Sequence, residues 1–295
     1  MKIIITGASG FVGQNLSRFL KIDNELIPLS IRYNQFKKFN FNSTVVIHLA
    51  GKAHDLKKTS EDKEYYEANT ELTKMVFNQF LKSSNKVFIF MSSVKAAADI
   101  VPNFLLEDVI PDPVTAYGKS KLAAEEYILS KEIPKNKRVY ILRPCMIHGP
   151  NNKGNLNLLY NFISKGVPYP FGRYVNKRSF VSIDNLCFII NELINNSKIK
   201  SGIYNIADDA SLSTIDLVQL ISEVLNKPVR ILKIPKVFVG IIAKIGDFFP
   251  IQINSERLHK LTENYEVSNL KIKKAIQKEL PLSAEDGIIK TIISF

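Results

Sequence analysis

Cysteine, tryptophan and long apolar runs are scarce or absent in this chain of 295 residues. It has no tryptophan and only two cysteines, Cys145 and Cys187, which lie far apart in apolar surroundings. Their spacing excludes a disulfide framework and the usual zinc patterns, so we expect no metal site and a cytoplasmic, reducing environment. No apolar stretch reaches the roughly 18 residues of a membrane-spanning helix, and the short run at residues 3–5 is no signal peptide.

Acidic residues are outnumbered by basic ones. The 28 Asp and Glu residues stand against 40 Lys and Arg residues, which gives a net charge of +12. Such an excess permits binding to phosphates, nucleic acids or anionic lipids. The lysines are spread along the whole chain, and no basic run alternates with aromatic residues. We therefore expect a solvated cationic surface and no nucleic-acid partner.

Strand and helix patterns alternate through the first half, which predicts an α/β fold with a doubly wound parallel sheet. Strands are expected at residues 2–6, 25–30, 44–49, 87–92 and 139–143, and helices at 11–20, 65–82 and 117–131. After residue 150 the pattern loosens into a smaller, α-rich lobe with strands returning near 180–206. Its helices are expected near 184–196, 214–226, 236–247, 254–263 and 283–294.

The first strand runs directly into three glycines, Gly7, Gly10 and Gly13, and then into a helix. The first glycine permits a tight turn, the second lets the backbone approach a pyrophosphate, and the third packs helix against strand. The phosphates then lie at the N-terminus of the helix. We therefore expect a Rossmann-type NAD(P)-binding domain over residues 1–150 and a mainly substrate-binding lobe over 151–295.

The end of the second strand bears on which dinucleotide binds. NAD-binding proteins usually present an acidic residue there, which binds the ribose 2′-hydroxyl. This chain has Ser30 and Arg32, which suit a 2′-phosphate better, so NADP(H) is slightly favoured and NAD(H) in a serine-lined site is the alternative. Only fourteen residues, 31–44, separate this strand from the next. We expect a turn and at most a short edge strand in that segment.

A serine, a tyrosine and a lysine form the candidate catalytic set. Ser93 follows the strand expected at 87–92, and Tyr117 and Lys121 lie four residues apart on one face of a helix. A nearby ammonium lowers the pKa of a phenol, and a serine hydroxyl adds a hydrogen bond to the same substrate oxygen. Because ligands bind at the carboxyl ends of parallel strands, the pattern predicts a proton relay beside a hydride carrier.

Together these motifs resemble the extended short-chain dehydrogenase/reductases, within their nucleotide-sugar epimerase/dehydratase branch. The matching segments are Thr6–Gly13, Val46–Gly51, Asn69, Ser92–Ser93, Tyr117–Lys121, Leu142–Pro144, Gly149–Pro150, Gly154–Leu156 and Arg178–Asp184. The resemblance implies that Tyr117 is the general acid/base, that Lys121 holds the nicotinamide ribose and tunes Tyr117, and that Ser93 binds the reacting oxygen.

The resemblance also implies two sets of ligand contacts. The cofactor would touch Gly7, Ser9, Gly10, Phe11, Val12, Gly13, Ser30, Arg32, Leu49, Ala50, Gly51, Asn69, Tyr117 and Lys121. The substrate would touch Ser92, Ser93, Lys95, Asn155, Arg178 and Arg257, the last with the weakest support. Asn155 and Arg178 would meet a sugar-nucleotide diphosphate. The alternatives are a surface ion pair for Arg178, a buried polar support for Asn69 and an exposed lysine for Lys95.

The two residues after Ser93 reduce the number of candidate reactions. Val94-Lys95 stands where the family's dehydratases carry an acidic pair, so dehydration is not expected. Reduction of a 4-keto UDP-hexose or UDP-N-acetylhexosamine derivative, for surface-polysaccharide precursors, is slightly favoured. A UDP-sugar 4-epimerase with tightly bound NAD is the alternative, and a non-catalytic cofactor-sensing or RNA-binding protein stays open as a different class. His148 is assigned no catalytic role.

Two further expectations concern partners. By resemblance the chain forms a homodimer through the helices at 65–82 and 117–131. The apolar segment 237–249 is either a buried helix of the lobe or a peripheral membrane contact, should the substrate be polyprenyl-linked.

Overall fold

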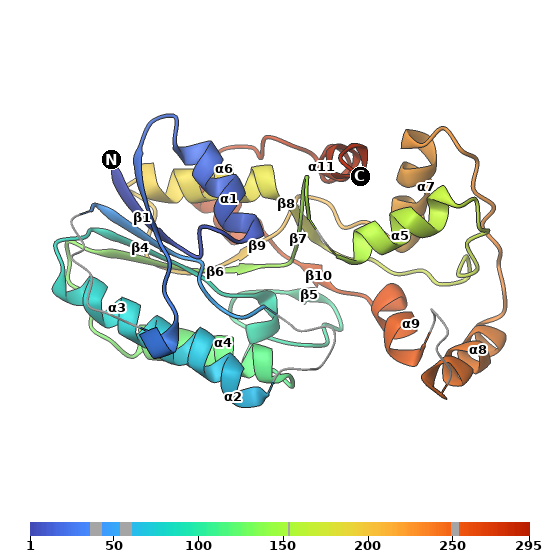
Figure 1. Ribbon diagram of the computed structural model, residues 1–295, viewed down its shortest axis with the longest axis horizontal. Coiled ribbons are helices and arrows are strands. Elements are labelled where there is room, and N and C mark those ends of the chain that lie inside the picture. The colour runs from blue at the N-terminus through green and yellow to red at the C-terminus, as the bar shows by residue number, and fades with distance from the viewer. Residues whose placement is uncertain (36–42, 54–60, 153, 249–253) are drawn as a thin grey trace.

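A fully parallel sheet of six strands forms the centre of the computed structural model, which describes residues 1–35, 43–53, 61–152, 154–248 and 254–295 (Figure 1). The strands lie in the order β2 (Glu25–Leu29), β1 (Lys2–Thr6), β3 (Val45–His48), β4 (Val87–Met91), β6 (Arg138–Pro144) and β9 (Gly202–Ile206). The predicted doubly wound parallel sheet is confirmed. The order changes direction at β1 and β3, where such sheets bind ligands beyond their carboxyl ends.

Helices cover both faces of the sheet. α1 (Phe11–Leu20), α6 (Ile183–Asn195) and α10 (Leu270–Ile276) pack on one face, and α3 (Leu72–Lys82) and α4 (Ala116–Leu129) pack on the other (Figure 1). Neighbouring residues of β1 point to opposite cores, since Ile3 and Ile5 join the first and Ile4 joins the second. Because both faces are covered, the strands are apolar along most of their length.

Of the segment 31–44, for which a turn and at most a short edge strand are expected, the structure describes residues 31–35 and 43–44, so the edge strand stays a prediction. After β2 the described chain makes only a 3-10 turn, Tyr33–Gln35, before residues 36–42, which lie outside the described part. β2 is therefore the edge strand of the sheet as far as the structure describes it.

The helix predicted at 65–82 is interrupted. α2 (Asp62–Tyr65) continues into a π-helical turn, η2 (Tyr66–Glu71), and then into α3. Asn69 lies in this wider turn and binds groups outside the helix, which accounts for the local departure from α-helical spacing.

The remaining elements lie outside the central sheet and its flanking helices. Short strands pair as β7 (Met146–His148) with β8 (Phe180–Ser182) and as β5 (Phe104–Leu105) with β10 (Glu266–Val267), none of which was predicted individually. The 3-10 turn η3 (Val94–Ala96) follows β4. The remaining helices are α5 (Asn155–Ser164), α7 (Thr214–Val224), α8 (Lys236–Phe248), α9 (Ser255–Thr262) and α11 (Ala284–Ile293).

These later helices share an apolar core of their own, which includes Leu159, Phe171, Ile221 and Ile288. The division of the chain at residue 150 stays a prediction, because α6 and β9 come after it and pack with the central sheet. In the described ranges, no helix combines the length and apolarity needed to cross a membrane.

Candidate active site

Two cavities lie along the carboxyl edge of the sheet and share Leu49, Gly51 and Lys52 in their walls. The larger, of about 1040 Å³, is lined by the glycine turn, the end of β2 and the loop after β3. The smaller, of about 430 Å³, is lined by Ser93, Tyr117 and Lys121, with the segments around β7, α5 and β8 completing its wall. The candidate catalytic residues therefore lie where the two cavities adjoin.

The glycine turn has the shape that a dinucleotide pyrophosphate requires. Gly7 has a φ of 69°, and a Cβ on it would lie 2.7 Å from the backbone nitrogen of Ala50. A Cβ on Gly13 would lie 2.3 Å from the carbonyl oxygen of Gly7, so side chains are excluded at both positions. α1 begins after Gly10 without a side-chain cap, which leaves its first N–H groups for an anion.

Most of the predicted cofactor residues near the glycine turn line the larger cavity. Gly7, Ser9, Gly10, Ser30, Arg32, Leu49, Ala50 and Gly51 line it, whereas Phe11, Val12 and Gly13 belong to the first turns of α1 behind the glycine loop. Ser30 and Arg32 are both exposed at the end of β2. In the described wall of this cavity the two carboxylates, Glu64 and Glu67, come from the helical run after residue 61 and not from β2.

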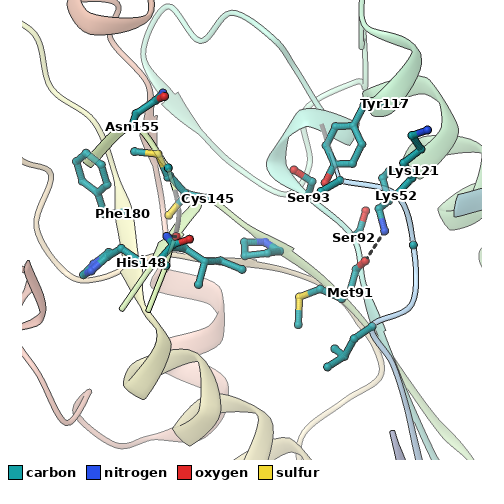
Figure 2. A pocket seen from close by; sticks show the side chains of 18 of the residues that line it. Lys52, Met91, Ser92, Ser93, Tyr117, Lys121, Cys145, His148, Asn155 and Phe180 are labelled. Atoms are coloured by element: carbon teal, nitrogen blue, oxygen red, sulfur yellow. Dashed lines mark hydrogen bonds between the residues drawn. The ribbon is translucent and has the colours of Figure 1, made fainter. Parts of the chain in front are cut away.

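The structure brings Tyr117 and Ser93 together. Ser93 follows β4, and Tyr117 lies in the first turn of α4, whose N-cap Thr115 accepts a hydrogen bond from the backbone of Gly118 at 3.2 Å. Figure 2 shows the Tyr117 ring pointing toward Ser93. Burial raises the pKa of the Tyr117 phenol, and its hydrogen bond with Ser93 offsets part of that rise. The predicted lowering of this pKa by Lys121 is therefore wrong.

The contacts of Lys121 explain why its ammonium does not lower the pKa of Tyr117. Its Nζ donates a hydrogen bond to the carbonyl oxygen of Met91 at 2.9 Å (Figure 2) and lies 5.0 Å from the ring centre of Phe90. Burial lowers the pKa of Lys121 to about 8, and the carboxylate of Glu125 acts in the opposite direction. Its ammonium is thus held against the end of β4, beside both cavities.

A buried ionic network beneath the site was not predicted. Glu125 follows Lys121 by one turn of α4 and forms an ion pair with Arg143 of β6, whose Nη2 lies 2.5 Å from Oε2. Ser92 donates a hydrogen bond to the same carboxylate, so this predicted substrate residue lies in the cavity wall with its hydroxyl already bound. The four-residue spacing in the sequence places Lys121 and Glu125 on one face of α4. It does not show that Arg143 of β6 lies opposite them.

Asn69 lies behind the cavity wall. Its carboxamide accepts from the backbone nitrogen of Lys52 at 2.8 Å and donates to the carbonyl oxygen of Lys52 at 3.1 Å and to Ser120 Oγ at 3.0 Å. It therefore ties the loop after β3 to α4. Lys52 was not predicted as a site residue from the sequence. It lines both cavities and forms an ion pair with Glu64.

The predicted substrate residues separate into two groups. Asn155, at the start of α5, lies in the wall opposite Tyr117, near Cys145 and Phe180 (Figure 2). Lys95 and Arg178 are held elsewhere. Lys95 Nζ lies 4.2 Å from the ring centre of Tyr265 and 3.7 Å from Asp99, and these two partners account for its departure from the predicted sugar pocket.

Arg178 Nη2 lies 3.3 Å from Glu263, and the two side chains are only 19% and 16% exposed, so this ion pair is largely buried and is not the surface pair of the alternative. The side chain of Arg257 in α9 is outside the described part of the protein. His148 lines the smaller cavity, but its Nδ1 lies 2.9 Å from Thr291 Oγ1 of α11 and its ring centre lies 6.2 Å from that of Phe180 of β8, so it packs between these elements.

Comparison with known proteins extends over nearly the whole chain. The sequence profile of the NAD dependent epimerase/dehydratase family matches residues 27–207, more than half of the chain. A UDP-glucose 4-epimerase of Vibrio cholerae is 30% identical, covering 99% of this chain and 95% of its own. An N-acetyl-α-D-glucosaminyl-diphospho-ditrans,octacis-undecaprenol 4-epimerase of Escherichia coli O157:H7 is 28% identical over 92% and 84%.

A GDP-6-deoxy-D-mannose reductase of Pseudomonas aeruginosa is 23% identical over 79% of this chain and 83% of its own. Among solved structures, MoeE5 in complex with UDP-glucose and NAD superposes with a TM-score of 0.78 at 17% identity, covering 100% of this chain and 98% of that one. This last likeness concerns the fold.

Proposed function

The chain belongs to the NAD dependent epimerase/dehydratase family, and we propose that it is an NAD(P)-dependent enzyme that reduces a 4-keto-hexose carried on a diphosphate. The membership confirms the resemblance seen in the motifs. The observation that carries the proposal is the meeting of Ser93, Tyr117 and Lys121 where the two cavities adjoin. A proton donor and a cation thus face the space in which nicotinamide and sugar would meet.

Tyr117 is the proposed proton donor. A bound reduced nicotinamide would supply the hydride that adds to carbon 4 of the sugar. The Tyr117 hydroxyl would give its proton to the carbonyl oxygen, which becomes the 4-hydroxyl, while Ser93 hydrogen-bonds the same oxygen. Burial raises the pKa of Tyr117, so the phenol keeps its proton near neutral pH, which is the form that reduction requires. Lys121 would hold the nicotinamide ribose by its ammonium.

NADPH is the cofactor that the β2 terminus favours. Ser30 and Arg32 line the larger cavity there, and a guanidinium suits a 2′-phosphate better than a bare ribose hydroxyl. NADPH also fits a reductase, which consumes reduced cofactor in each turnover and must exchange it.

The substrate class follows from what the relatives share. The UDP-glucose, undecaprenol-linked and GDP-linked substrates named for them are all hexoses joined to a diphosphate. We propose the same class here. Asn155, on the wall opposite Tyr117, would contact the sugar diphosphate from the start of α5.

Epimerisation at carbon 4 is the second candidate. It is supported by the two 4-epimerases that are 30% and 28% identical over almost the whole chain. An epimerase removes and returns the same hydride, so it retains a tightly bound NAD and needs no added cofactor. The same three residues would serve, with Tyr117 acting first as base.

The nucleotide bound by the purified protein separates the two candidates. Denaturation should release no stoichiometric NAD, and titration should give at least about tenfold tighter binding of NADPH than of NADH, which corresponds to roughly 1.4 kcal/mol. The double variant Ser30→Asp/Arg32→Ala should reverse this preference, whereas Arg18→Ala, on α1 away from β2, should not. Stoichiometric NAD in the wild-type protein would refute the reductase and support the epimerase.

A further inference from the structure

Helix α8 carries an apolar face that the rest of the described protein leaves uncovered. Its five large apolar residues between 45% and 72% exposed are Val237, Phe238, Ile241, Ile242 and Ile245. Their spacing places them on one side of the helix, because residues one, four, five and eight positions apart fall within about 140° of each other at 100° per residue. The exposed side chains therefore form one stripe, which we call the α8 face.

The opposite side of α8 is firmly packed. Val239 and Ala243 are 2% and 1% exposed, and Val239 belongs to the core formed by the later helices. In the last turn of α8, Asp247 accepts hydrogen bonds from the backbone nitrogen of Ser255 at 2.9 Å and from its hydroxyl at 2.6 Å, which joins α8 to α9. The α8 face is thus the outer side of a docked helix, at the end of the molecule far from the sheet (Figure 1).

Basic residues predominate in the segment before α8 and in most of the helix, whose acidic residue, Asp247, lies in the last turn and is bound to Ser255. Residues 227–246 contain no Asp or Glu and include five basic residues, namely Lys227, Arg230, Lys233, Lys236 and Lys244. Lys244 is an exposed residue of α8 at the border of the apolar stripe, and Lys233 is exposed just before the helix begins. Apolar side chains flanked by cations are the pattern of helices that lie in the interface of a bilayer with anionic lipids.

We propose that the protein docks peripherally on a bilayer containing anionic phospholipid, with α8 parallel to the surface and the α8 face among the acyl chains. Burial of the stripe would supply the apolar part of the binding energy, and the neighbouring lysines would meet the lipid phosphates. A second copy of the chain fits this face less well. A symmetric contact through it would bring the lysines of both copies together, in a protein whose net charge is already +12.

Docking of this kind rests on no assumption about the reaction. It concerns the outer side of α8, which contributes no residue to either cavity described above. Turnover of a water-soluble nucleotide sugar and binding to lipid can therefore be measured separately, and each can fail without the other.

Vesicle sedimentation tests the proposal. Wild-type protein should sediment with vesicles of phosphatidylcholine and phosphatidylglycerol, and at least about tenfold less with phosphatidylcholine alone or at high salt. The variant Phe238→Gln/Ile242→Gln should lose binding by about tenfold or more. The control Ile22→Gln/Ile110→Gln, which changes two side chains outside α8 that are 83% and 87% exposed, should bind as the wild type does.

A second variant changes only charged residues, so it tests lipid binding while the apolar stripe stays intact. Lys233→Gln/Lys244→Gln should lose the preference for anionic vesicles while its unfolding temperature stays that of the wild type. Failure of the wild-type protein to sediment with anionic vesicles, or undiminished binding by the α8 variant, would overturn the proposal. So would a lipid-free dimer, seen by light scattering, that the α8 variant converts to monomer.

Discussion

The Tyr117 hydroxyl is the atom group on which the proposed proton transfer depends. Tyr117→Phe removes it and leaves the ring against Tyr65, whose centre lies 6.2 Å away. We expect kcat to fall by at least about 10²-fold, since a positioned acid contributes that much or more, while the Kd for NADPH is unchanged. Steady-state kinetics and fluorescence titration measure the two quantities.

Tyr127→Phe is the matched control for this change. Tyr127 lies on the same helix, and its hydroxyl donates to Asn78 at 2.8 Å, away from both cavities. It should leave kcat within about threefold, in keeping with a surface change of less than 1 kcal/mol. Equal losses in the two variants would mean that Tyr117 acts only by stabilising α4.

The Lys121 ammonium predicts how activity depends on pH. Burial lowers its pKa to about 8, so the charged form is present below that pH and is lost as the pH rises through it. Activity that needs the ammonium should therefore decline above about pH 8. Glu125→Gln removes the carboxylate that raises this pKa, so the alkaline limb of the pH–rate profile should move to lower pH.

Glu126→Gln, an exposed neighbour on the same helix, is the control and should leave the limb in place. Glu125→Gln should also lower the free energy of unfolding by about 3 kcal/mol, measured in urea, because it leaves the Arg143 guanidinium buried without a carboxylate. A loss of stability with an unmoved alkaline limb would show that Glu125 has no influence on Lys121.

At the scale of elements, the first turn of α4 links stability to catalysis. Thr115 caps it by accepting from Gly118, and Ser283 caps α11 by accepting from the backbone nitrogen of Asp286 at 3.0 Å. Replacing either residue by Ala should cost about 1 kcal/mol of unfolding free energy. Only Thr115→Ala should also reduce kcat, because its cap precedes Tyr117 by two residues. Equal effects of the two caps on kcat would contradict the assignment of α4 as the catalytic helix.

Elements with a regular local pattern were predictable, and those shaped by distant partners were not. The apolar run before Gly7 and the periodicity of residues 11–20 locate β1 and α1, since both signals are local. The π-helical turn at Tyr66–Glu71 has no such signal, because it depends on the contacts of Asn69 with Lys52 and Ser120. The same holds for the short strands β5, β7, β8 and β10, each of which pairs with a strand remote in the sequence.

The candidate site shows the same division. Ser93, Tyr117 and Lys121 could be selected because their residue types and spacing carry a chemical rationale, and the structure places them together. The contacts of Lys95 could not be predicted, since its Nζ lies near Asp99 and against the ring of Tyr265, which comes from a remote part of the chain. The pKa of Tyr117 depends on burial, which a sequence does not state.

At the scale of the whole molecule, NADPH bound in the larger cavity should contact three segments at once, namely the glycine turn, the end of β2 and the loop after β3. Its binding should raise the unfolding temperature, with a gain of about 2.7 kcal/mol at a hundred times the Kd. Gly13→Ala should abolish this gain, because its Cβ would lie 2.3 Å from the carbonyl oxygen of Gly7. Gly240→Ala, whose Cβ meets open space, is the control and should retain it.

The predicted homodimer through α3 and α4 and the cytoplasmic location remain predictions for the whole molecule. Light scattering of the purified protein measures the first.

Transfer of deuterium from labelled NADPH to the sugar tests the central claim most directly. The protein is incubated with a UDP-4-keto-hexose and NADPH that carries deuterium at its transferable position, and the products are examined by mass spectrometry and NMR. We predict one deuterium at carbon 4 of the product for each NADPH consumed, and none with Tyr117→Phe. Interconversion of 4-epimers without deuterium uptake or NADPH consumption would contradict the reductase.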